Sequence, residues 1–311
     1  MENKIILSGI KPTGRVHIGN YFGAMKQLVD LKATYAMIAD YHTLNFIQNK
    51  DEMKKLILDV VIDHLALGLD PKETVIFKQS DVSAHTELTW IFDTITTVPY
   101  LMRAHAYKDA EAKGKEVSAG TFNYPVLMAT DILLYDTDVV PVGADQKQHI
   151  EYARDIAGKF NNIFGETFKL PEPLILPDVG VVPGTDGRKM SKSYGNTIPL
   201  FASDEEIEKS VLSIVTDSGS EIPQNVFAIH SLFKTKEELE PLYNEKKGKY
   251  KDLKDALIID IKKFVAPFRE RREEIAKDEG YIYKVIKEGS QNAKEVADKK
   301  LKEVKEKIGV L

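Results

Sequence analysis

The first 160 residues alternate between short apolar runs and stretches with apolar residues at helical spacing. The apolar runs, which predict buried strands, lie at residues 4–8, 35–39, 74–77 and 139–142. Helical spacing begins at residue 18 and recurs over residues 51–67, 84–96, 125–134 and 146–160. Strands that alternate with helices usually pair in parallel through right-handed crossovers. We therefore expect an α/β fold with a Rossmann-like, doubly wound parallel sheet over residues 1–195.

Only helical spacing remains beyond residue 196. Helices are expected over residues 203–215, 235–247, 250–276, with an interruption near Pro267, and 290–308. Ser203 and Glu206 have the spacing of a capping box at the start of the first of them. This pattern predicts a second, all-helical domain at residues 196–289. It also predicts a C-terminal helix, 290–311, that packs back on the first domain.

Composition and charge are those of a globular protein, with 43% hydrophobic and 29% charged residues. No apolar run approaches the length needed to cross a bilayer, and residues 1–10 lack a signal-peptide core, so we expect no membrane association. The chain has no cysteine, which excludes disulfides, thiolate metal sites and a cysteine nucleophile and agrees with a cytoplasmic location.

The formal net charge of −5 argues against a surface coated by nucleic acid, and no DNA partner is expected. Local basic patches remain possible at residues 246–249 and 269–272. Such runs are equally consistent with a solvated helix face.

The sequence Pro-Thr-Gly-Arg-Val-His-Ile-Gly-Asn at residues 12–20 connects the first strand to the first helix. The backbone N–H groups of a helix start favour phosphate, and Gly19 would permit close approach of a purine ring. His17 and Asn20 could meet phosphate or ribose oxygens. Alternatively, Gly19 and Asn20 form only a turn, and His17 is a surface residue.

A second motif, Gly-Arg-Lys-Met-Ser-Lys-Ser, spans residues 187–193. It places Lys189 and Lys192 on a loop rich in small residues, which is typical of a flexible clamp over phosphates. The alternative is a solvated basic loop. Together, the two motifs predict the two halves of an ATP site.

In these motifs the chain resembles the class I aminoacyl-tRNA synthetases, specifically the bacterial-type tryptophanyl-tRNA synthetases. The matching segments cover most of the chain and lie at residues 9–14, 17–21, 117–120, 124–125, 128, 131–135, 140–143, 145–149, 187–193 and 215–218. The two nucleotide motifs are shared across the class, whereas residues 128–149 indicate tryptophan within it.

The resemblance implies a site for ATP and a catalytic set within it. The catalytic set is His17, Asn20, Lys189 and Lys192. The implied ATP-binding residues are Lys11, Pro12, Thr13, Gly19, Asn20, Gly143, Ala144, Asp145, Val182, Lys189, Met190, Ser191, Lys192 and Ser193. Magnesium is expected on the β- and γ-phosphates, with no metal site built from protein side chains.

Two roles within the ATP site stay open. Related enzymes carry lysines that reach pyrophosphate from the region of Lys108 and Lys113, but the spacing here does not decide between the two. Asp145 could accept from ribose hydroxyls or could simply cap a helix.

For the amino acid, the resemblance implies a pocket around Asp131. Its members are Leu7, His42, Tyr124, Met128, Asp131, Val140, Val142 and Gln146. A carboxylate among apolar walls needs a donor, and the indole N–H of tryptophan is one. Spacing alone favours pairing of Asp131 with an internal arginine or a backbone amide, and the resemblance reverses that preference. Leu7 replaces an aromatic residue of the bacterial relatives, so the stacking wall differs.

The expected reaction is activation of tryptophan by ATP, followed by transfer to tRNA(Trp). The carboxylate attacks the α-phosphate and expels pyrophosphate, so catalysis needs orientation and charge neutralisation and no general base. A homodimer is implied, and an iron–sulfur cluster is excluded by the absence of cysteine. Trp90, the single tryptophan, is expected in the core or at an interface.

Three other functions fit parts of the sequence. A tyrosyl-tRNA synthetase shares the architecture, a small-molecule nucleotidyltransferase could use the same nucleotide fold, and a tRNA-binding paralogue could lack catalysis. The helical domain argues against the second of these, and intact lysine and histidine motifs argue against the third.

Overall fold

The centre of the molecule is a parallel sheet, and it confirms the predicted fold class. In this computed structural model, residues 4–112, 114, 116–143, 147–175, 182–216 and 221–311 are described. Strands β1 (Leu7–Ile10), β2 (Tyr35–Ile38) and β3 (Val75–Lys78) pair in that order, and β4 (Val139–Pro141) pairs with β5 (Glu172–Leu174). A parallel bridge between Ile6 and Val139 places β4 beside β1, so the strands succeed one another as β5, β4, β1, β2 and β3.

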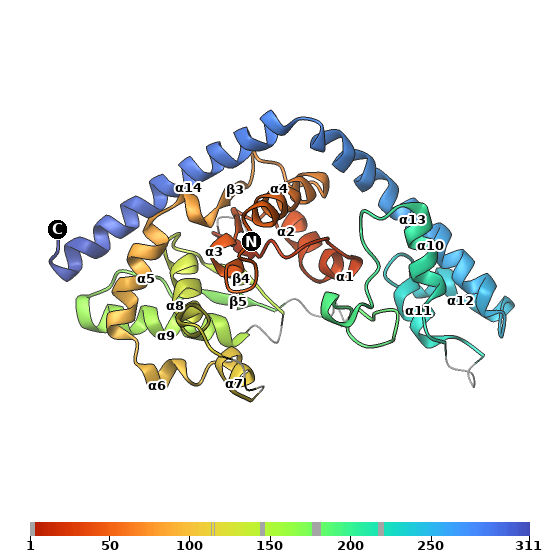
Figure 1. Cartoon of the computed structure of the whole chain (residues 1–311), viewed down its shortest axis with the longest axis horizontal. Coiled ribbons are helices and arrows are strands. Elements are labelled where there is room, and N and C mark those ends of the chain that lie inside the picture. The colour runs from red at the N-terminus through yellow and green to blue at the C-terminus, as the bar shows by residue number, and fades with distance from the viewer. Residues whose placement is uncertain (1–3, 113, 115, 144–146, 176–181, 217–220) are drawn as a thin grey trace.

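Helices cover both faces of the sheet because successive strand residues point to opposite sides. Leu7, Met37 and Phe77 face a core built with α5 (Ala84–Ile95), α8 (Ala119–Leu133) and α9 (Lys147–Phe164). Their neighbours Ile6, Ile38 and Ile76 face α4 (Lys50–Ala66) and the first turns of α14 (Glu279–Ile308). Figure 1 shows these two layers on either side of the strands.

The shorter helices of the first half connect these layers. They are α1 (Ile18–Asn20), the π-helical turn η1 (Tyr21–Met25), α2 (Lys26–Asp30), α3 (Asp40–Thr43), the 3-10 turn η2 (Gln79–Asp81), α6 (Val98–Leu101) and α7 (His105–Ala112). The sequence pattern did not predict α3, α6, α7 or the strand β5. It also started α8 too late, since Ser118 caps this helix and Pro125 lies inside it.

The second half of the chain is helical, as predicted. It contains the 3-10 turn η4 (Lys192–Tyr194), α10 (Asp204–Leu212), α11 (Gln224–His230), α12 (Lys236–Glu245), α13 (Tyr250–Ala276) and α14. Ser203 and Glu206 form the expected capping box of α10. Three details were wrong: α11 was not predicted, α13 continues through Pro267 without interruption, and the last helix begins at Glu279 rather than at residue 290. The expected boundary at residue 290 therefore falls inside a continuous helix.

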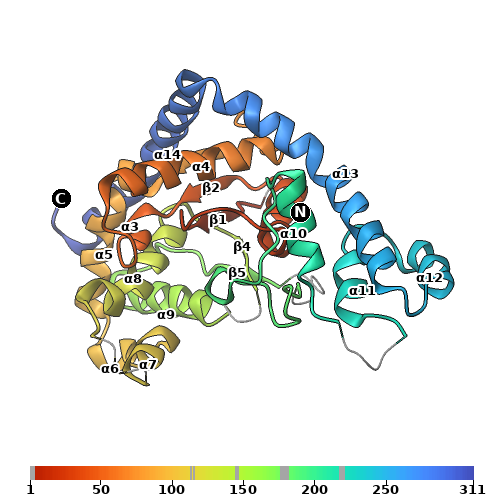
Figure 2. The ribbon, with the colours of Figure 1, turned by 45° about the vertical axis from the view of Figure 1, so that its right-hand side comes forward.

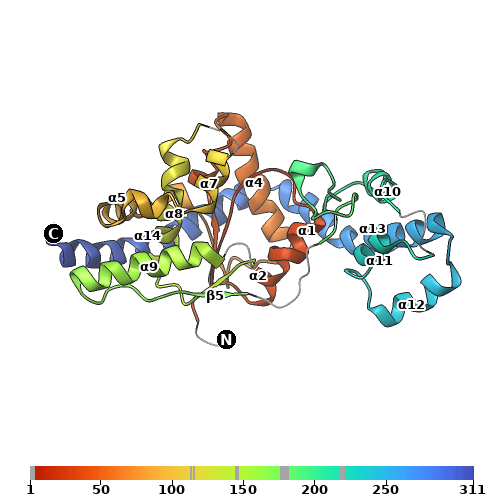
Figure 3. The same cartoon turned by 90° about the horizontal axis from the view of Figure 1, so that it is seen from below.

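Helices α13 and α14 form an arc along one side of the whole molecule (Figures 1 and 2). Seen from below, α10 to α13 gather at one end and the sheet lies near the middle (Figure 3). Arg272 of α13 joins this end to α4 through Asp59 and Asp63, at 2.8 and 2.6 Å. None of the described helices has the length and apolar character to span a membrane.

A glycine lets α14 cross the edge strand β3 in contact with its backbone. A Cβ added at Gly289 would lie 1.9 Å from the carbonyl oxygen of Ile76, too close for any side chain. The neighbouring Ser290 donates to Asp81 at 2.9 Å, which fixes the crossing. This contact explains how the last helix packs back on the sheet.

We expect Gly289→Ala to lower the free energy of unfolding by about 3 kcal/mol, because helix and strand must separate to admit the methyl group. Urea unfolding measures the change. Gly158→Ala is the matched control: this glycine also lies in a helix, but its added Cβ would meet nothing within 4 Å, so a gain of about 0.5–1 kcal/mol is expected. Equal stabilities of the two variants would contradict the proposed contact.

Candidate active site

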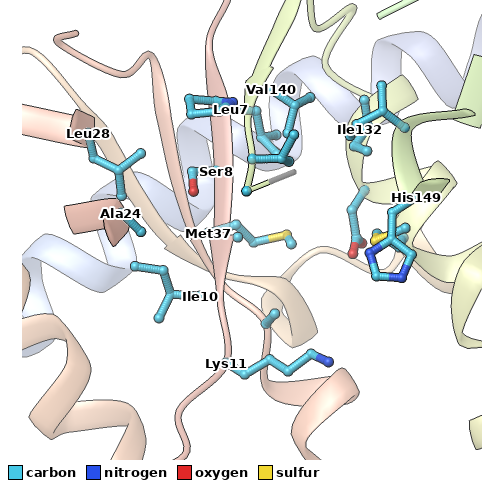
Figure 4. Close-up of a pocket in the computed structure, with 18 of the residues that line it drawn as sticks. Leu7, Ser8, Ile10, Lys11, Ala24, Leu28, Met37, Ile132, Val140 and His149 are labelled. Atoms are coloured by element: carbon cyan, nitrogen blue, oxygen red, sulfur yellow. The ribbon is translucent and has the colours of Figure 1, made fainter. Parts of the chain in front are cut away.

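A cavity of about 250 Å³ opens at the carboxyl ends of β1 and β4. The chain leaves these neighbouring strands toward opposite faces of the sheet, which creates the crevice where doubly wound folds bind ligands. Figure 4 shows Leu7 and Ser8 of β1, Val140 of β4 and Lys11 around this space. Every described residue of the predicted amino-acid pocket lines it: Leu7, His42, Tyr124, Met128, Asp131, Val140 and Val142. Gln146 lies outside the described residues.

Asp131 of α8 is a polar group of the cavity that is held by several neighbours. Its side chain is almost completely buried and accepts three hydrogen bonds. Gln79 Nε2 and His85 Nδ1 lie 2.7 Å from Oδ1, and His42 Nε2 lies 2.9 Å from Oδ2. Burial alone would raise the pKa of Asp131, but the hydrogen bonds from His42 and His85 outweigh it and lower the pKa to about 2. The carboxylate is therefore ionised, and Oδ2 can accept one further hydrogen bond.

Asp131 was expected to bond either a ligand or an internal donor, and the structure supplies internal donors that still leave room for a ligand. The sequence suggested an internal arginine or backbone amide as the alternative to a ligand, whereas the structure provides two imidazoles and a carboxamide. Sequence reasoning missed Gln79 and His85, and it missed Tyr135, whose hydroxyl lies 2.8 Å from His85 Nε2. Gln79 and His85 lie in no matching segment, whereas Tyr135 ends the matching segment 131–135 but was given no role in the site.

His42 and Tyr124 form a second part of the cavity wall. The two rings pack edge to face with centroids 6.1 Å apart, and the Tyr124 hydroxyl lies 2.8 Å from His149 Nε2. Lys11 extends its ammonium group over the Tyr124 ring, 5.6 Å from the centroid. Burial lowers the pKa of Lys11, and the charge of Asp131 opposes that shift. The cavity thus combines an apolar wall, an anion and a cation.

The histidine of the first motif is buried, contrary to the surface alternative. His17 is 6% exposed, and its Nδ1 atom has no hydrogen-bond partner among the described residues. Burial, assisted by the charge of Lys192, lowers the pKa of His17 to about 4. The imidazole is neutral at pH 7 and can still donate to or accept from a ligand. Asn20 Oδ1 accepts from the His17 backbone N–H at 3.2 Å.

Gly19 brings the two motifs together. A Cβ at this position would lie 3.0 Å from His17 Nδ1 and 3.3 Å from the Cβ of Met190. Glycine is therefore required here because Met190 of the second motif comes close to residue 19. The sequence had given only the approach of a purine ring as the reason. Met190 and Val182 are buried in one cluster with Ile18. The segment 198–200 completes the contact, because Ile18 N donates to Ile198 O and Leu200 N to Val16 O.

The lysine loop touches the first motif through a charged side chain. Lys192 Nζ donates to the carbonyl oxygens of Thr13 and Gly14, at 3.2 and 2.9 Å. Burial lowers the pKa of Lys192, and the charge of Asp63 opposes this effect. Lys189 is exposed. The side chains of Ser191 and Ser193 bond to each other at 2.9 Å. These contacts bring residues of the predicted ATP site from both motifs close together. Pro12, another predicted member, is buried.

The remaining residues predicted for the ATP site differ in where they lie. Gly143 lines the cavity, but Ala144, Asp145 and Lys113 are not among the described residues. Lys108 is exposed on α7 and does not line the cavity. Across the described residues, no group of three or more His, Asp or Glu side chains could hold a metal ion.

The chain matches one family over nearly its whole length. The family described as tRNA synthetases class I (W and Y) matches residues 1–300. A tryptophan–tRNA ligase from Fusobacterium nucleatum subsp. nucleatum is 49% identical over 98% of this chain and 98% of its own. Another from Rhodopirellula baltica is 45% identical over 94% of this chain and 95% of its own.

Solved structures agree with these sequence relatives. Tryptophanyl-tRNA synthetase from Campylobacter jejuni, complexed with ADP and tryptophan, is similar with a TM-score of 0.91 and 42% identity, covering 98% of this chain and 99% of its own. Tyrosyl-tRNA synthetase from Archaeoglobus fulgidus, complexed with L-tyrosine, has a TM-score of 0.68 at 21% identity, covering 88% of this chain and 90% of its own, which supports the fold alone.

Proposed function

The chain belongs to the class I tRNA synthetases of the tryptophan and tyrosine group, and from this premise we propose that its cavity is the place where tryptophan and ATP react. The protein functions as a tryptophan–tRNA ligase: it activates L-tryptophan with ATP to tryptophanyl adenylate and pyrophosphate, then transfers tryptophan to the 3′-terminal ribose of tRNA. The single observation that carries the site assignment is the buried carboxylate of Asp131, which lines the cavity beside the apolar side chains of Met128, Val140 and Val142.

The indole is proposed to lie between Met128, Val140 and Val142, with its N–H directed at Asp131. The remaining lone pair on Oδ2 supports this placement, because a buried acceptor strongly favours a ligand that supplies a donor. Gln79 and His85, which do not line the cavity, hold Oδ1 from behind, and His42 holds Oδ2 from the cavity wall. A phenol hydroxyl is also a donor, so the contrast with tyrosine rests on the tryptophan-specific relatives and on the assay below.

ATP is proposed to bind between the two motifs that Gly19 brings together. The neutral His17 and the amide of Asn20 would meet the nucleotide at the start of α1, and Lys11 would neutralise part of its charge. Lys189 and Lys192 would stabilise the charge that develops on the leaving pyrophosphate. Magnesium would be carried mainly by the phosphates.

We expect tryptophan alone among the standard amino acids to support rapid exchange of pyrophosphate into ATP. The assay requires adenylate formation and no tRNA, so it reports on the amino acid alone. It is run with each amino acid in turn. Exchange with tyrosine and none with tryptophan would favour the tyrosyl-tRNA synthetase. Exchange with no amino acid, in a folded protein, would favour the non-catalytic alternative.

The helical region 196–289 is proposed to contact the anticodon of tRNA(Trp) in the cytoplasm, while residues 1–195 catalyse the reaction and residues 290–311 pack on them. Its basic side chains are only partly available. Arg269 bonds Asp204 and the Ala202 carbonyl, and Arg272 bonds Asp59 and Asp63, so this cluster joins elements within the chain. Lys247 also pairs with Glu221, at 3.2 Å. Binding through the remaining cations would weaken with salt.

The proposed homodimer is expected to use the face of α5 and α6. Trp90 is 73% exposed, so the expected core position is wrong, and this exposure supports the proposed interface. Val98 at the start of α6 is also exposed. Large apolar side chains at such exposure are typical of protein contacts, and tryptophan is prominent among the residues that dominate them.

Trp90→Glu should raise the dissociation constant of the dimer by about 30-fold or more, the scale of a strong interface residue. Sedimentation equilibrium measures it, and folding should be little affected because the side chain is exposed in the monomer. Ile259→Glu is the matched control, since Ile259 is 65% exposed on the distant α13. A dimer broken by the control and not by Trp90→Glu would place the interface elsewhere.

A further inference from the structure

One buried asparagine connects both arms of the lysine loop. Asn196 is 2% exposed. Its Oδ1 atom accepts from the backbone N–H of Ser191 at 2.8 Å, and its Nδ2 atom donates to the Lys189 carbonyl at 3.1 Å. Asn196 thus holds the backbone of Lys189 and of Ser191, the residue directly before Lys192. Asn196 does not line the cavity.

The second hydrogen of the Asn196 amide goes to the opposite arm. Nδ2 donates to Asp186 Oδ1 at 2.6 Å, and the same carboxylate accepts from the backbone N–H and from Nε of Arg188. The Arg188 guanidinium in turn lies over the Tyr194 ring, 4.3 Å from its centroid. Asp186 and Asn196 therefore form the two ends of a polar link across the loop.

The backbone around this link is fitted to it. A Cβ added at Gly184 would lie 2.2 Å from Asn196 Nδ2 and 2.8 Å from its carbonyl oxygen, so only glycine leaves room for the side chain. Thr185 N donates to the Asn196 carbonyl at 2.9 Å, and Gly184 N donates to the Arg188 carbonyl at 2.6 Å. These bonds close the loop on itself.

We propose that Asn196, with Asp186 as its partner, is a positioning residue that holds Lys189 and Lys192 in the geometry required by the departing pyrophosphate. It acts through the backbone of residues 189 and 191 and does not touch the substrates. Holding charged groups in place before the reaction avoids their reorganisation in the transition state, and a misplacement of about 1 Å can cost 10²-fold in rate. The inference rests on the proposed role of the lysine loop.

The test compares Asn196→Asp, the exchange variant Asp186→Asn/Asn196→Asp, and Asn162→Asp as a surface control on α9. In Asn196→Asp two carboxylates oppose each other and the Lys189 carbonyl loses its donor. The double variant restores a donor and an acceptor between positions 186 and 196. We expect kcat for tryptophan-dependent pyrophosphate exchange to fall about 10–100-fold in Asn196→Asp, with KM for tryptophan unchanged, and to recover partly in the double variant.

Limited digestion by trypsin gives a readout that does not depend on activity. Cleavage after Arg188, Lys189 and Lys192 should accelerate in Asn196→Asp and slow again in the double variant, while Asn162→Asp matches the unmodified chain in both assays. The proposal is overturned if Asn196→Asp leaves either the cleavage rate or kcat unchanged. It is also overturned if the loss of kcat follows thermal unfolding and the double variant does not recover it.

Lys192→Ala separates this proposal from the function on which it rests. If Lys192→Ala lowers kcat and Asn196→Asp does not, the loop acts as proposed but Asn196 does not position it. If Lys192→Ala leaves kcat unchanged, the role of the lysine loop is itself wrong, and the inference about Asn196 fails with it.

Discussion

Lys192→Ala should lower kcat for tryptophan activation by about 10²-fold or more and leave KM for tryptophan nearly unchanged. The lysine is proposed to stabilise charge that appears only as pyrophosphate leaves, and removing one such donor costs about 2.7–4 kcal/mol in the transition state. In the structure its ammonium group bonds the carbonyls of Thr13 and Gly14. These are neutral acceptors, so phosphate oxygens can compete for it.

Pyrophosphate exchange at varied tryptophan concentration separates the two constants. Lys192→Met is a useful second variant because it keeps the length of the side chain and removes the charge. Lys72→Ala, an exposed lysine outside the cavity lining, is the control. A variant that retained its kcat and lost only affinity for tryptophan would refute the assigned role.

Asp131→Asn should lower kcat/KM for tryptophan by about 10²-fold, because a hydrogen bond to a charged acceptor is worth about 1.5–3 kcal/mol. The ratio of kcat/KM for tryptophan to that for phenylalanine or tyrosine should fall as well. The substitution fits the site. The Nδ1 atom of His42 has no hydrogen-bond partner in the described part of the chain and can take the proton, so that Nε2 accepts from the new amide. That amide would then present N–H rather than oxygen to the indole.

The alanine variant is less informative here. Asp131→Ala would leave Gln79, His42 and His85 without their buried acceptor, and each buried donor left unpaired costs about 1–3 kcal/mol of stability. Thermal melting of Asp131→Asn, with the exposed Asp255→Asn as control, separates lost recognition from lost folding. Unchanged discrimination in a folded Asp131→Asn protein would make Asp131 a purely structural carboxylate.

Much of the architecture follows from local pattern. Apolar runs placed the four predicted strands to within a few residues, since a strand buried on both faces has few polar positions. The capping box of Ser203 and Glu206 was identified because its two bonds are made within one turn. The errors at Pro125 and Pro267 have one cause: packing of a long helix outweighs the local cost of proline.

The site divides along the same line. Part of the cavity lining could be named from the sequence, because the resemblance to the family carried those positions over, whereas lining residues such as Gln27 and Met37 were not named. The bonds of Asp131 could not, since Gln79 and His85 lie 52 and 46 positions away. Nor could the contact of Lys192 with Thr13, across 179 positions. By itself the sequence determined the fold class, the two nucleotide motifs and the family. Only the tertiary structure decided which donors hold the carboxylate, where the lysines rest and which glycines must stay, because those depend on groups that packing brings together from distant segments.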